Sequence, residues 1–343
     1  EQLTDILYKS HAIDKPEFFS LFCKFTTEME YFEPGTYTIK TNYDYKQLVN
    51  TLQSGPDLGE EITVMFREGI TVQQLAALLE ENGLHTADEI LEACNSSDYD
   101  SYSDVAAITN TSDRYYKLEG YLFPDTYQFY MSDDPANVID KFLRNFDNKF
   151  TDDLYDALDA LNDRLAQRMR TNGFTETEIT DGRLSLYDLI TVASLVEKET
   201  AKTSESASIA SVIYNRLCSK LYPCLQIDAT IQYALDERKE VLSNADKGVI
   251  SPYNTYTNAG LPAGPIANPG MNSIRAALYP ADTDYYFYAL GNDGVHKFSK
   301  TYYEHQDFLA SLEDDTTDEA APDEQADAET GDASADADAN EEA

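Results

Sequence analysis

Ala193-Ser194-Leu195-Val196-Glu197-Lys198-Glu199-Thr200 is the stretch that ends an apolar helical run with carboxylates. Ser185, followed three residues later by Asp188, predicts a capping box that begins this helix. At about 100° per residue, Glu197 falls on the apolar stripe, whereas Glu199 turns toward solvent. A carboxyl group on such a stripe loses hydration, which favours the protonated form that a general acid needs. Glu197 is therefore the candidate catalytic acid, and the alternative is a helix-end glutamate that reaches into water.

Around this helix, the sequence predicts a mainly helical domain over residues 172–312. A second amphipathic helix is expected over 208–217, and Asp228 is expected as the N-cap of a third. A loop rich in Pro and Gly over 260–270 has little conformational entropy to lose, so it can hold backbone groups in place. The turn residues at 291–294 predict a β-hairpin near the end of the domain.

Polar and aromatic side chains between the second helix and the Pro/Gly loop are candidates for binding a sugar. Sugar rings stack on aromatic faces, and hydroxyl groups bond to amides. The candidates are Tyr214, Asn215, Gln226, Asp228, Tyr253, Asn254 and Tyr256. Each has a structural alternative as a cap or as a loop-bracing hydrogen bond, and for Asp228 the cap is favoured.

The composition excludes two classes of partner. The 343 residues carry a net charge of −38, and the segment 313–343 supplies fourteen acidic side chains and no basic one. No basic stripe is available to release counterions from nucleic acid or to dock on anionic lipid. The acidic segment has no aromatic residue with which to build a core, so it is predicted to be a disordered tail.

The cysteines and histidines indicate no metal site, because the chain has no Cys-x-x-Cys pair and its four histidines are not paired at ligand spacing. Cys218 and Cys224 bracket a short loop and are a candidate disulfide in an oxidising compartment. Cys23 and Cys94 follow apolar helical positions and are expected as buried thiols. No apolar run approaches the roughly 20 residues of a membrane span. Because the chain opens inside a helical pattern without a methionine, we expect that an upstream segment has been removed.

An internal repeat organises residues 1–134. Apolar positions within 3–19 recur within 75–91 at an offset of 72, and positions within 48–52 recur within 138–142 at an offset of 90. The change of offset indicates one duplicated unit with an insertion in the second copy. The first copy lacks its opening strand.

The second copy predicts the order strand, helix, helix, strand over 62–66, 71–81, 87–93 and 117–130. This layout resembles the LysM-type glycan-binding module, and a purely structural scaffold is the alternative. Residues 135–171 are expected to form connecting helices. The predicted class is therefore α+β, with a duplicated LysM-like region followed by a helical domain that ends in a β-hairpin.

Seven segments occur together in a fixed order. They are Glu119 to Tyr127, Ala193 to Thr200, Ala210 to Leu217, Leu225-Gln226-x-Asp228, Tyr253 to Tyr256, Gly260 to Gly270, and Gly294-x-His296-x-Phe298-Ser299. The set resembles the YceG-like endolytic murein transglycosylases over nearly all of residues 1–310. The resemblance implies a lysozyme-related catalytic domain, a catalytic glutamate at Glu197 and peptidoglycan strands as the substrate. It further implies a single membrane-spanning helix upstream and action on the outer face of the cell membrane.

The implied reaction needs no cofactor and only one carboxyl group. Glu197 would protonate the oxygen between MurNAc and GlcNAc, and its carboxylate would then take the proton of the MurNAc C6 hydroxyl, which closes a 1,6-anhydro ring. Two other functions remain open: a lysozyme-like hydrolase with Asp228 as second carboxylate, and a cell-wall binding protein without activity. Peptidoglycan synthases are candidate partners that the sequence does not specify.

Overall fold

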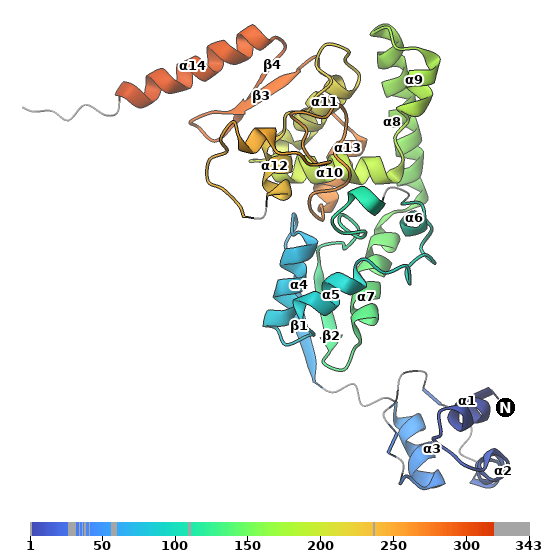
Figure 1. Ribbon diagram of the computed structural model, residues 1–343. Helices are drawn as coiled ribbons and strands as arrows, with labels where there is room; N and C mark the ends of the chain where they lie inside the picture. Colours follow the sequence, from blue (N-terminus) through green and yellow to red (C-terminus); the bar gives the residue numbers. More distant parts are fainter. Residues whose placement is uncertain are drawn as a thin grey trace, which may run out of the picture.

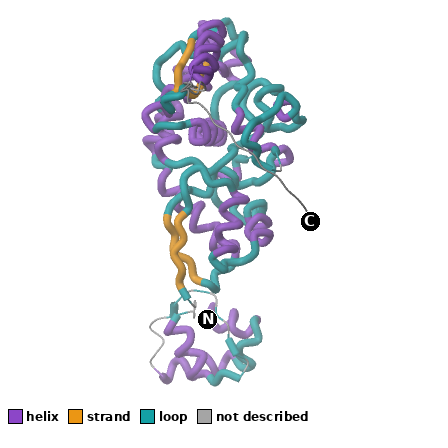
Figure 2. The backbone as a smooth tube through the Cα atoms, turned by 90° about the vertical axis from the view of Figure 1, so that its left-hand side faces the viewer, coloured by secondary structure: helices purple, strands orange, loops and turns teal. Residues whose placement is uncertain are grey.

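The computed structural model describes residues 2–318 except 27–31, 34, 36, 38, 41, 56–59, 109–110 and 236. The described elements are helices with two small antiparallel sheets, which confirms the predicted α+β class. Figures 1 and 2 show three consecutive parts along the chain: a small helical lobe, a unit that contains the first sheet, and a larger helical lobe.

The first part consists of the helices α1 (Gln2–Lys9), α2 (Pro16–Thr26) and α3 (Tyr45–Ser54). They pack around a core of their own, which contains the buried Phe19 and the predicted buried thiol of Cys23. We call this part the N-terminal lobe.

The second part, the strand–helix unit, runs in the order predicted for the second copy of the repeat. The strand β1 (Glu61–Met65) is followed by α4 (Val72–Glu81), α5 (Ala87–Ala93), the short α6 (Ser103–Ala106) and η1 (Thr111–Asp113), and β2 (Thr126–Tyr130). β1 pairs antiparallel with β2. The expected strand 117–130 is shorter than predicted, because Gly120 adopts a left-handed conformation with φ of +92° and its neighbours form a turn.

Two helices connect this unit to the third part, as predicted: α7 (Pro135–Lys149) and α8 (Asp152–Thr171). The third part, the helical lobe, is built around α10 (Leu186–Glu199), which begins at the predicted capping box of Ser185 and Asp188. Its other elements are α9 (Glu176–Asp181), η2 (Thr203–Glu205), α11 (Ser206–Leu217), α12 (Asp228–Ala234), η3 (Asp246–Gly248), α13 (Met271–Leu278), the hairpin β3 (Phe287–Leu290) and β4 (His296–Ser299), and α14 (Tyr302–Asp318).

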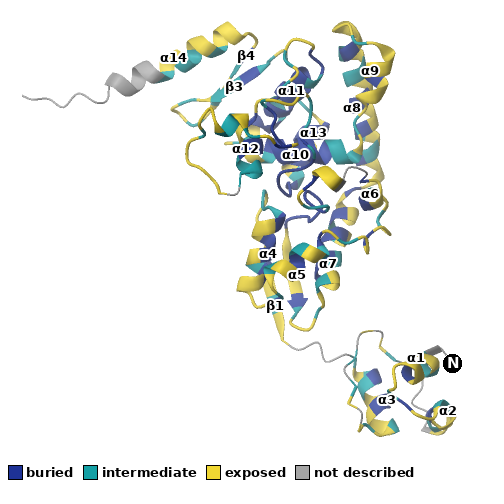
Figure 3. Ribbon diagram, in the orientation of Figure 1, coloured by how far each residue is buried: buried dark blue, intermediate teal, exposed yellow. Residues whose placement is uncertain are grey.

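The α10 helix is buried on all sides. Every residue from 189 to 196 is buried, because α8, α11, α12 and α13 all pack against this helix. One continuous core extends from Val64 in the strand–helix unit to Leu278 in the helical lobe (Figure 3), so the core has no break at the predicted boundaries 134 and 171.

The last described helix, α14, enters the predicted acidic tail. α14 continues to Asp318, so the first six residues of the predicted segment 313–343 are helical, and the rest of that segment lies outside the described residues. Within the described part of the chain, no helix combines the length and the apolar character that crossing a bilayer requires.

Candidate active site

A cleft of about 810 Å³ opens beside the C-terminal end of α10. Its walls come from α10, α11, α12, the hairpin and α14, and Figure 1 shows α12 and the hairpin close to α10. Among the lining side chains are Glu199, Arg216, Gln226, Asp228, Lys247, Tyr256, Tyr288, His296 and His305. The cleft therefore combines aromatic rings, an amide and titratable groups.

Glu199, and not Glu197, is the α10 carboxyl group that lines this cleft. Its Oε2 atom accepts a hydrogen bond of 3.0 Å from the Tyr288 hydroxyl, and the Ala229 N–H donates a second bond. Burial raises the pKa of Glu199 above its usual range, and these two bonds only partly offset that effect. A raised pKa favours the protonated form, which is the form that a general acid beside an open cleft needs.

Glu197 lies where α10 meets the strand–helix unit. Its Oε2 atom accepts a bond of 3.2 Å from the Gly270 N–H, and its side chain is next to Gly69. The neighbouring Lys198 donates to the Gly69 carbonyl at 3.2 Å. Burial, together with the charge of Glu197, raises the pKa of Glu68 in the same junction. The contacts of Glu197 are those of a residue that joins two parts of the molecule.

Three of the seven predicted sugar-binding residues line the cleft: Gln226, Asp228 and Tyr256. Asp228 accepts from the Tyr256 hydroxyl and lies 3.2 Å from Lys247 Nζ. The prediction that Asp228 is an N-cap is wrong by one position, because Ile227 precedes the helix and Asp228 is its first residue. Gln226 has a φ of +57°, and its side chain accepts from Arg216 at 3.0 Å.

The other four predicted residues are buried in the interior, where they brace the backbone. The Tyr214 hydroxyl donates to the Ala277 carbonyl at 2.9 Å, and the Asn215 amide donates to the carbonyls of residues 283 and 285. The Asn254 amide donates to the carbonyls of residues 247 and 249. Tyr253 is 0% exposed and packs against the rings of Tyr115 and Tyr233. The amides of Asn215 and Asn254 and the hydroxyl of Tyr214 thus bond to backbone carbonyls, whereas the Tyr253 hydroxyl is buried without a hydrogen-bond partner among the described residues.

Sequence reasoning assigned no role to several side chains that line the cleft, among them Tyr288, His296 and Lys247. The segment Gly294-x-His296-x-Phe298-Ser299 had been part of the family resemblance, but no role was assigned to its histidine. The position of Tyr288 on the hairpin had no signal of its own, because alternating aromatic residues are typical of any β-strand.

A buried polar cluster connects the strand–helix unit to the helical lobe. Glu119, which is 0% exposed, accepts bonds from the Val72 N–H at 3.1 Å, from the Tyr233 hydroxyl at 2.9 Å and from the Asn268 amide at 3.1 Å. The same Asn268 side chain accepts from the Gly120 N–H at 3.0 Å. These bonds link three segments that are far apart in the sequence.

Cys218 and Cys224 are both free thiols in the structure, so the predicted disulfide is not formed here. The Cys218 side chain packs with Met169 and Ile179, on the side of α8 and α9, whereas the backbone of Cys224 forms a β-bridge with Gly260. Cys94 is buried, as predicted. Among the described residues, no cluster of three or more His, Cys, Asp or Glu side chains is arranged to hold a metal ion.

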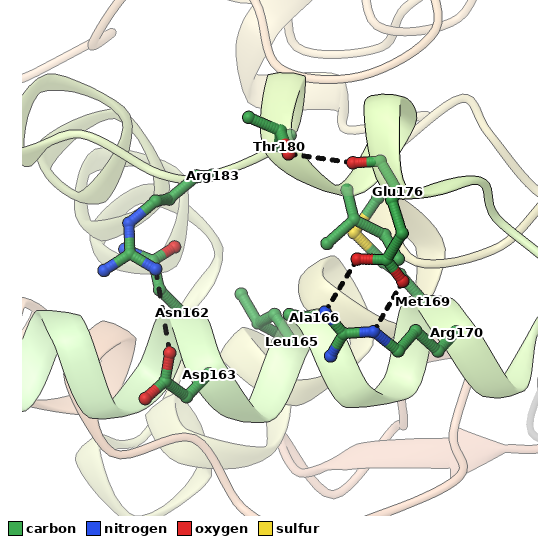
Figure 4. Close-up of a pocket in the computed structure, with 11 residues that line it drawn as sticks. Asn162, Asp163, Leu165, Ala166, Met169, Arg170, Glu176, Thr180 and Arg183 are labelled. Carbon is green, nitrogen blue, oxygen red and sulfur yellow. Dashed lines mark hydrogen bonds and ion pairs between the residues drawn. The ribbon is translucent and has the colours of Figure 1, made fainter.

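A second cavity, of about 310 Å³, lies between α8 and α9 (Figure 4). Its charged side chains pair with one another: Arg170 bonds to Glu176 at 2.8 Å, and Arg183 lies 3.7 Å from Asp163. The cavity contains none of the predicted site residues. The cleft beside α10 is therefore the better candidate for an active site.

Comparison with known proteins places the chain among enzymes of the bacterial cell wall. A model of the YceG-like family matches residues 1–311. The chain belongs to the YceG-like family. It is 31% identical over 312 residues to the endolytic murein transglycosylase of Bacillus subtilis, an alignment that covers 88% of this chain and 79% of the relative.

Further relatives agree with this placement. The endolytic murein transglycosylase of Streptococcus pneumoniae strain R6 is 28% identical over 326 residues, and the chain spans only 54% of its length. A crystal structure of a YceG-like protein from Listeria monocytogenes aligns with a TM-score of 0.57 and 28% identity, over 89% of this chain and 93% of that chain.

Proposed function

We propose that the chain is an endolytic murein transglycosylase that cleaves the MurNAc–GlcNAc bond of nascent peptidoglycan strands. The relatives that match most of this chain carry that name. The observation on which the proposal rests is the position of Glu199, a carboxyl group with a raised pKa in a cleft of about 810 Å³. We propose Glu199 as the acid in place of Glu197, because Glu199 lines the cleft, whereas Glu197 accepts a bond from Gly270 and lies next to Gly69 of the strand–helix unit.

In this reaction Glu199 donates its proton to the glycosidic oxygen, and the bond from that oxygen to C1 of MurNAc breaks. The C6 hydroxyl of the same MurNAc then attacks C1, loses its proton to a base and closes a 1,6-anhydro ring. No water is consumed, so the strand ends in an anhydro sugar. A lysozyme-like hydrolase would instead add water and produce a reducing end.

The alternative hydrolase would use Asp228 as a second carboxylate. Against that role, Asp228 is already bonded to Tyr256 and paired with Lys247. We infer that this trio binds substrate hydroxyl or amide groups along the cleft. Gln226 lies on the same wall and extends this polar surface.

The experiment compares Glu199→Gln with Glu197→Gln on purified, uncrosslinked glycan strands, with products identified by mass spectrometry. Glu199→Gln removes the proton and keeps the shape, so cleavage should fall about 10²- to 10⁴-fold. Glu197→Gln is the matched control two residues away: its amide oxygen still accepts from Gly270, so activity should stay within a few fold. Wild-type products that end in reducing sugars would establish the hydrolase. If Glu197→Gln abolishes cleavage and Glu199→Gln does not, the acid is Glu197.

We further propose that the strand–helix unit is a LysM-like module and that the N-terminal lobe is the partial first copy of the repeat. The burial pattern supports a common origin, because Phe19 and Cys23 in α2 are buried like Ile90 and Cys94 in the strand–helix unit. Phe19 and Ile90 are 71 residues apart, as are Cys23 and Cys94. The offset of 72 found in the sequence therefore changes by one residue at the second helix of the repeat. A purely structural scaffold remains the alternative, and binding of the unit to soluble glycan strands distinguishes the two.

The proposed substrate also indicates a place of action. Peptidoglycan is assembled outside the cytoplasmic membrane, so we propose that the chain works on that side, anchored by a helix upstream of residue 1. Cell fractionation of the full-length protein, followed by protease treatment of intact spheroplasts, tests both statements.

A further inference from the structure

His296 and Glu205 form a buried pair at the edge of the cleft, outside the roles assigned so far. The Nδ1 atom of His296 lies 2.7 Å from Glu205 Oε2, and the His296 backbone N–H donates to Glu205 Oε1 at 3.0 Å. The two side chains are 7% and 8% exposed. Burial acts to raise the pKa of Glu205, but the bonds from His296 outweigh it and the pKa is lowered. Glu205 is therefore an ionised carboxylate that orients an imidazole ring.

This bond determines which ring nitrogen is available to a substrate. A carboxylate can only accept, so Nδ1 of the neutral imidazole carries the proton and Nε2 carries the lone pair. His296 lines the cleft, and its Nε2 atom has no bonding partner within the described part of the chain. A histidine base oriented by a carboxylate is the arrangement found in nucleophile-activating sites.

His296 lines the same cleft as the acid, Glu199. Tyr288 stands between the two: its hydroxyl donates to Glu199 at 3.0 Å, and its ring meets the His296 ring edge to face, with centroids 5.5 Å apart. The charge of His296 also acts on the pKa of Glu199, which places the two groups within electrostatic reach. The cleft thus contains a proton donor and a separate proton acceptor.

We propose that His296, oriented by Glu205, is the general base that takes the proton of the MurNAc C6 hydroxyl. This inference rests on the proposed function. The O6–H bond breaks as its proton moves to Nε2, O6 bonds to C1, and the bond from C1 to the leaving oxygen breaks as Glu199 gives that oxygen its proton. The step ends with imidazolium beside Glu205 and carboxylate at Glu199. After the product leaves, the proton returns to Glu199 through solvent.

The decisive variants are His296→Asn and His296→Gln. The Asn amide can occupy the position of Nδ1 and still donate to Glu205, but it offers nothing at the position of Nε2. The Gln amide extends toward the position of Nε2, where it can bond to a hydroxyl group but cannot accept its proton. Both variants should lower kcat on defined glycan strands about 10²-fold or more with little change in KM.

The matched control is His85→Asn. His85 also neighbours a glutamate, with Nδ1 3.9 Å from Glu89 Oε2, but it lies in the strand–helix unit away from the cleft. Its φ of +54° is one that asparagine adopts readily, so the variant should fold and cleave like the wild type.

Glu205→Gln tests the role of the carboxylate. The amide keeps an oxygen that can accept from Nδ1 of His296, but it has no charge with which to stabilise the imidazolium that forms in the step. We therefore expect kcat to fall, by less than in His296→Asn, with little change in KM.

Three results would overturn the proposal. The first is cleavage by His296→Asn within threefold of the wild type. The second is retention of activity by His296→Gln alone, which would make His296 a positioning residue. The third is a kcat for Glu205→Gln that equals that of the wild type. Failure of the proposed function would look different, because the wild type itself would then form no anhydro ends.

Discussion

Glu119 is a carboxyl group without exposed surface that titrates near neutral pH. Burial raises its pKa to about 7, against the opposing effects of the bonds from Val72 and Tyr233 and of the charges of Arg114 and Lys198. Unfolding returns the group to water, where its pKa is close to 4.5. Between these values the folded chain binds more protons than the unfolded chain. The free energy of unfolding that Glu119 contributes should therefore fall as the pH rises from about 4.5 to about 7.

Glu119→Gln removes this titration and keeps an oxygen that accepts from Val72. We expect the stability of the variant relative to the wild type to increase with pH across this range, by at most about 1.4 kcal/mol per pH unit. Urea unfolding of both proteins at a series of pH values measures this difference, in which the titration of other groups cancels. Parallel stability curves would mean that Glu119 does not titrate between the two values.

The two glutamates at the end of α10 show how far sequence alone can locate an acid. The spacing predicted the helix, its capping box and a carboxyl group near its end, and all three are present. Sequence reasoning chose Glu197, whereas Glu199 is the residue that lines the cleft, because that reasoning assumed one buried face and one solvent face. Residues 189–196 are buried all round, so helical periodicity carries no information about which face meets the substrate.

Sequence alone was equally unable to determine the role of the buried tyrosines and asparagines. Tyr214 and Asn254 carry the groups that a sugar site needs, and these same groups satisfy backbone carbonyls in the interior. Whether a polar side chain serves a ligand or the fold depends on which backbone atoms surround it, and those come from segments far away in the sequence.

At the scale of elements, the turn at Gly120 determines how the strand–helix unit docks on the helical lobe. A Cβ atom at this position would lie 2.6 Å from Pro265 Cγ and 2.8 Å from Ile190 Cγ2, and φ is +92°. Gly120→Ala should lower the free energy of unfolding by about 2–5 kcal/mol, the sum of about 1–2 for the left-handed backbone and about 1–3 for overpacking. Urea unfolding measures the loss.

Gly173→Ala is the control for backbone strain alone. Gly173 has a φ of +77°, but a Cβ atom there would meet nothing within 4 Å. We expect Gly173→Ala to lower the free energy of unfolding by about 1–2 kcal/mol. If the two variants lose the same free energy of unfolding, the close approach of the new Cβ atom at position 120 to Pro265 is relieved at little energetic cost.

Local signals explain which elements could be predicted. The caps at Thr71, Thr86 and Ser185 and the turn at 291–294 lie within a few residues of the elements they define, and those elements are present. The expected strand 117–130 failed in its first half because the turn at Gly120 packs against a distant part of the chain, where the Gly120 N–H bonds to Asn268 Oδ1 and Pro265 leaves no room for a Cβ atom.

At the scale of the whole molecule, the cores divide the chain differently from the sequence repeat. The repeat joins the N-terminal lobe and the strand–helix unit within residues 1–134. The structure instead gives the strand–helix unit one core with the helical lobe, and the N-terminal lobe a separate one. Similarity between two copies of a repeat indicates their common origin. A shared hydrophobic core indicates which parts of the chain fold together.

The separate core of the N-terminal lobe has a calorimetric consequence. Two cores without shared buried residues need not melt together, so a heat-capacity scan should contain a minor peak from residues 2–54 beside a major peak from the rest. At about 0.7 kcal/mol of enthalpy per residue near 60 °C, the areas of the peaks should scale with the lengths of the two parts. Deleting residues 1–55 should abolish the minor peak and leave the midpoint of the major one in place. A single sharp peak whose midpoint falls on that deletion would mean that the two parts form one cooperative unit.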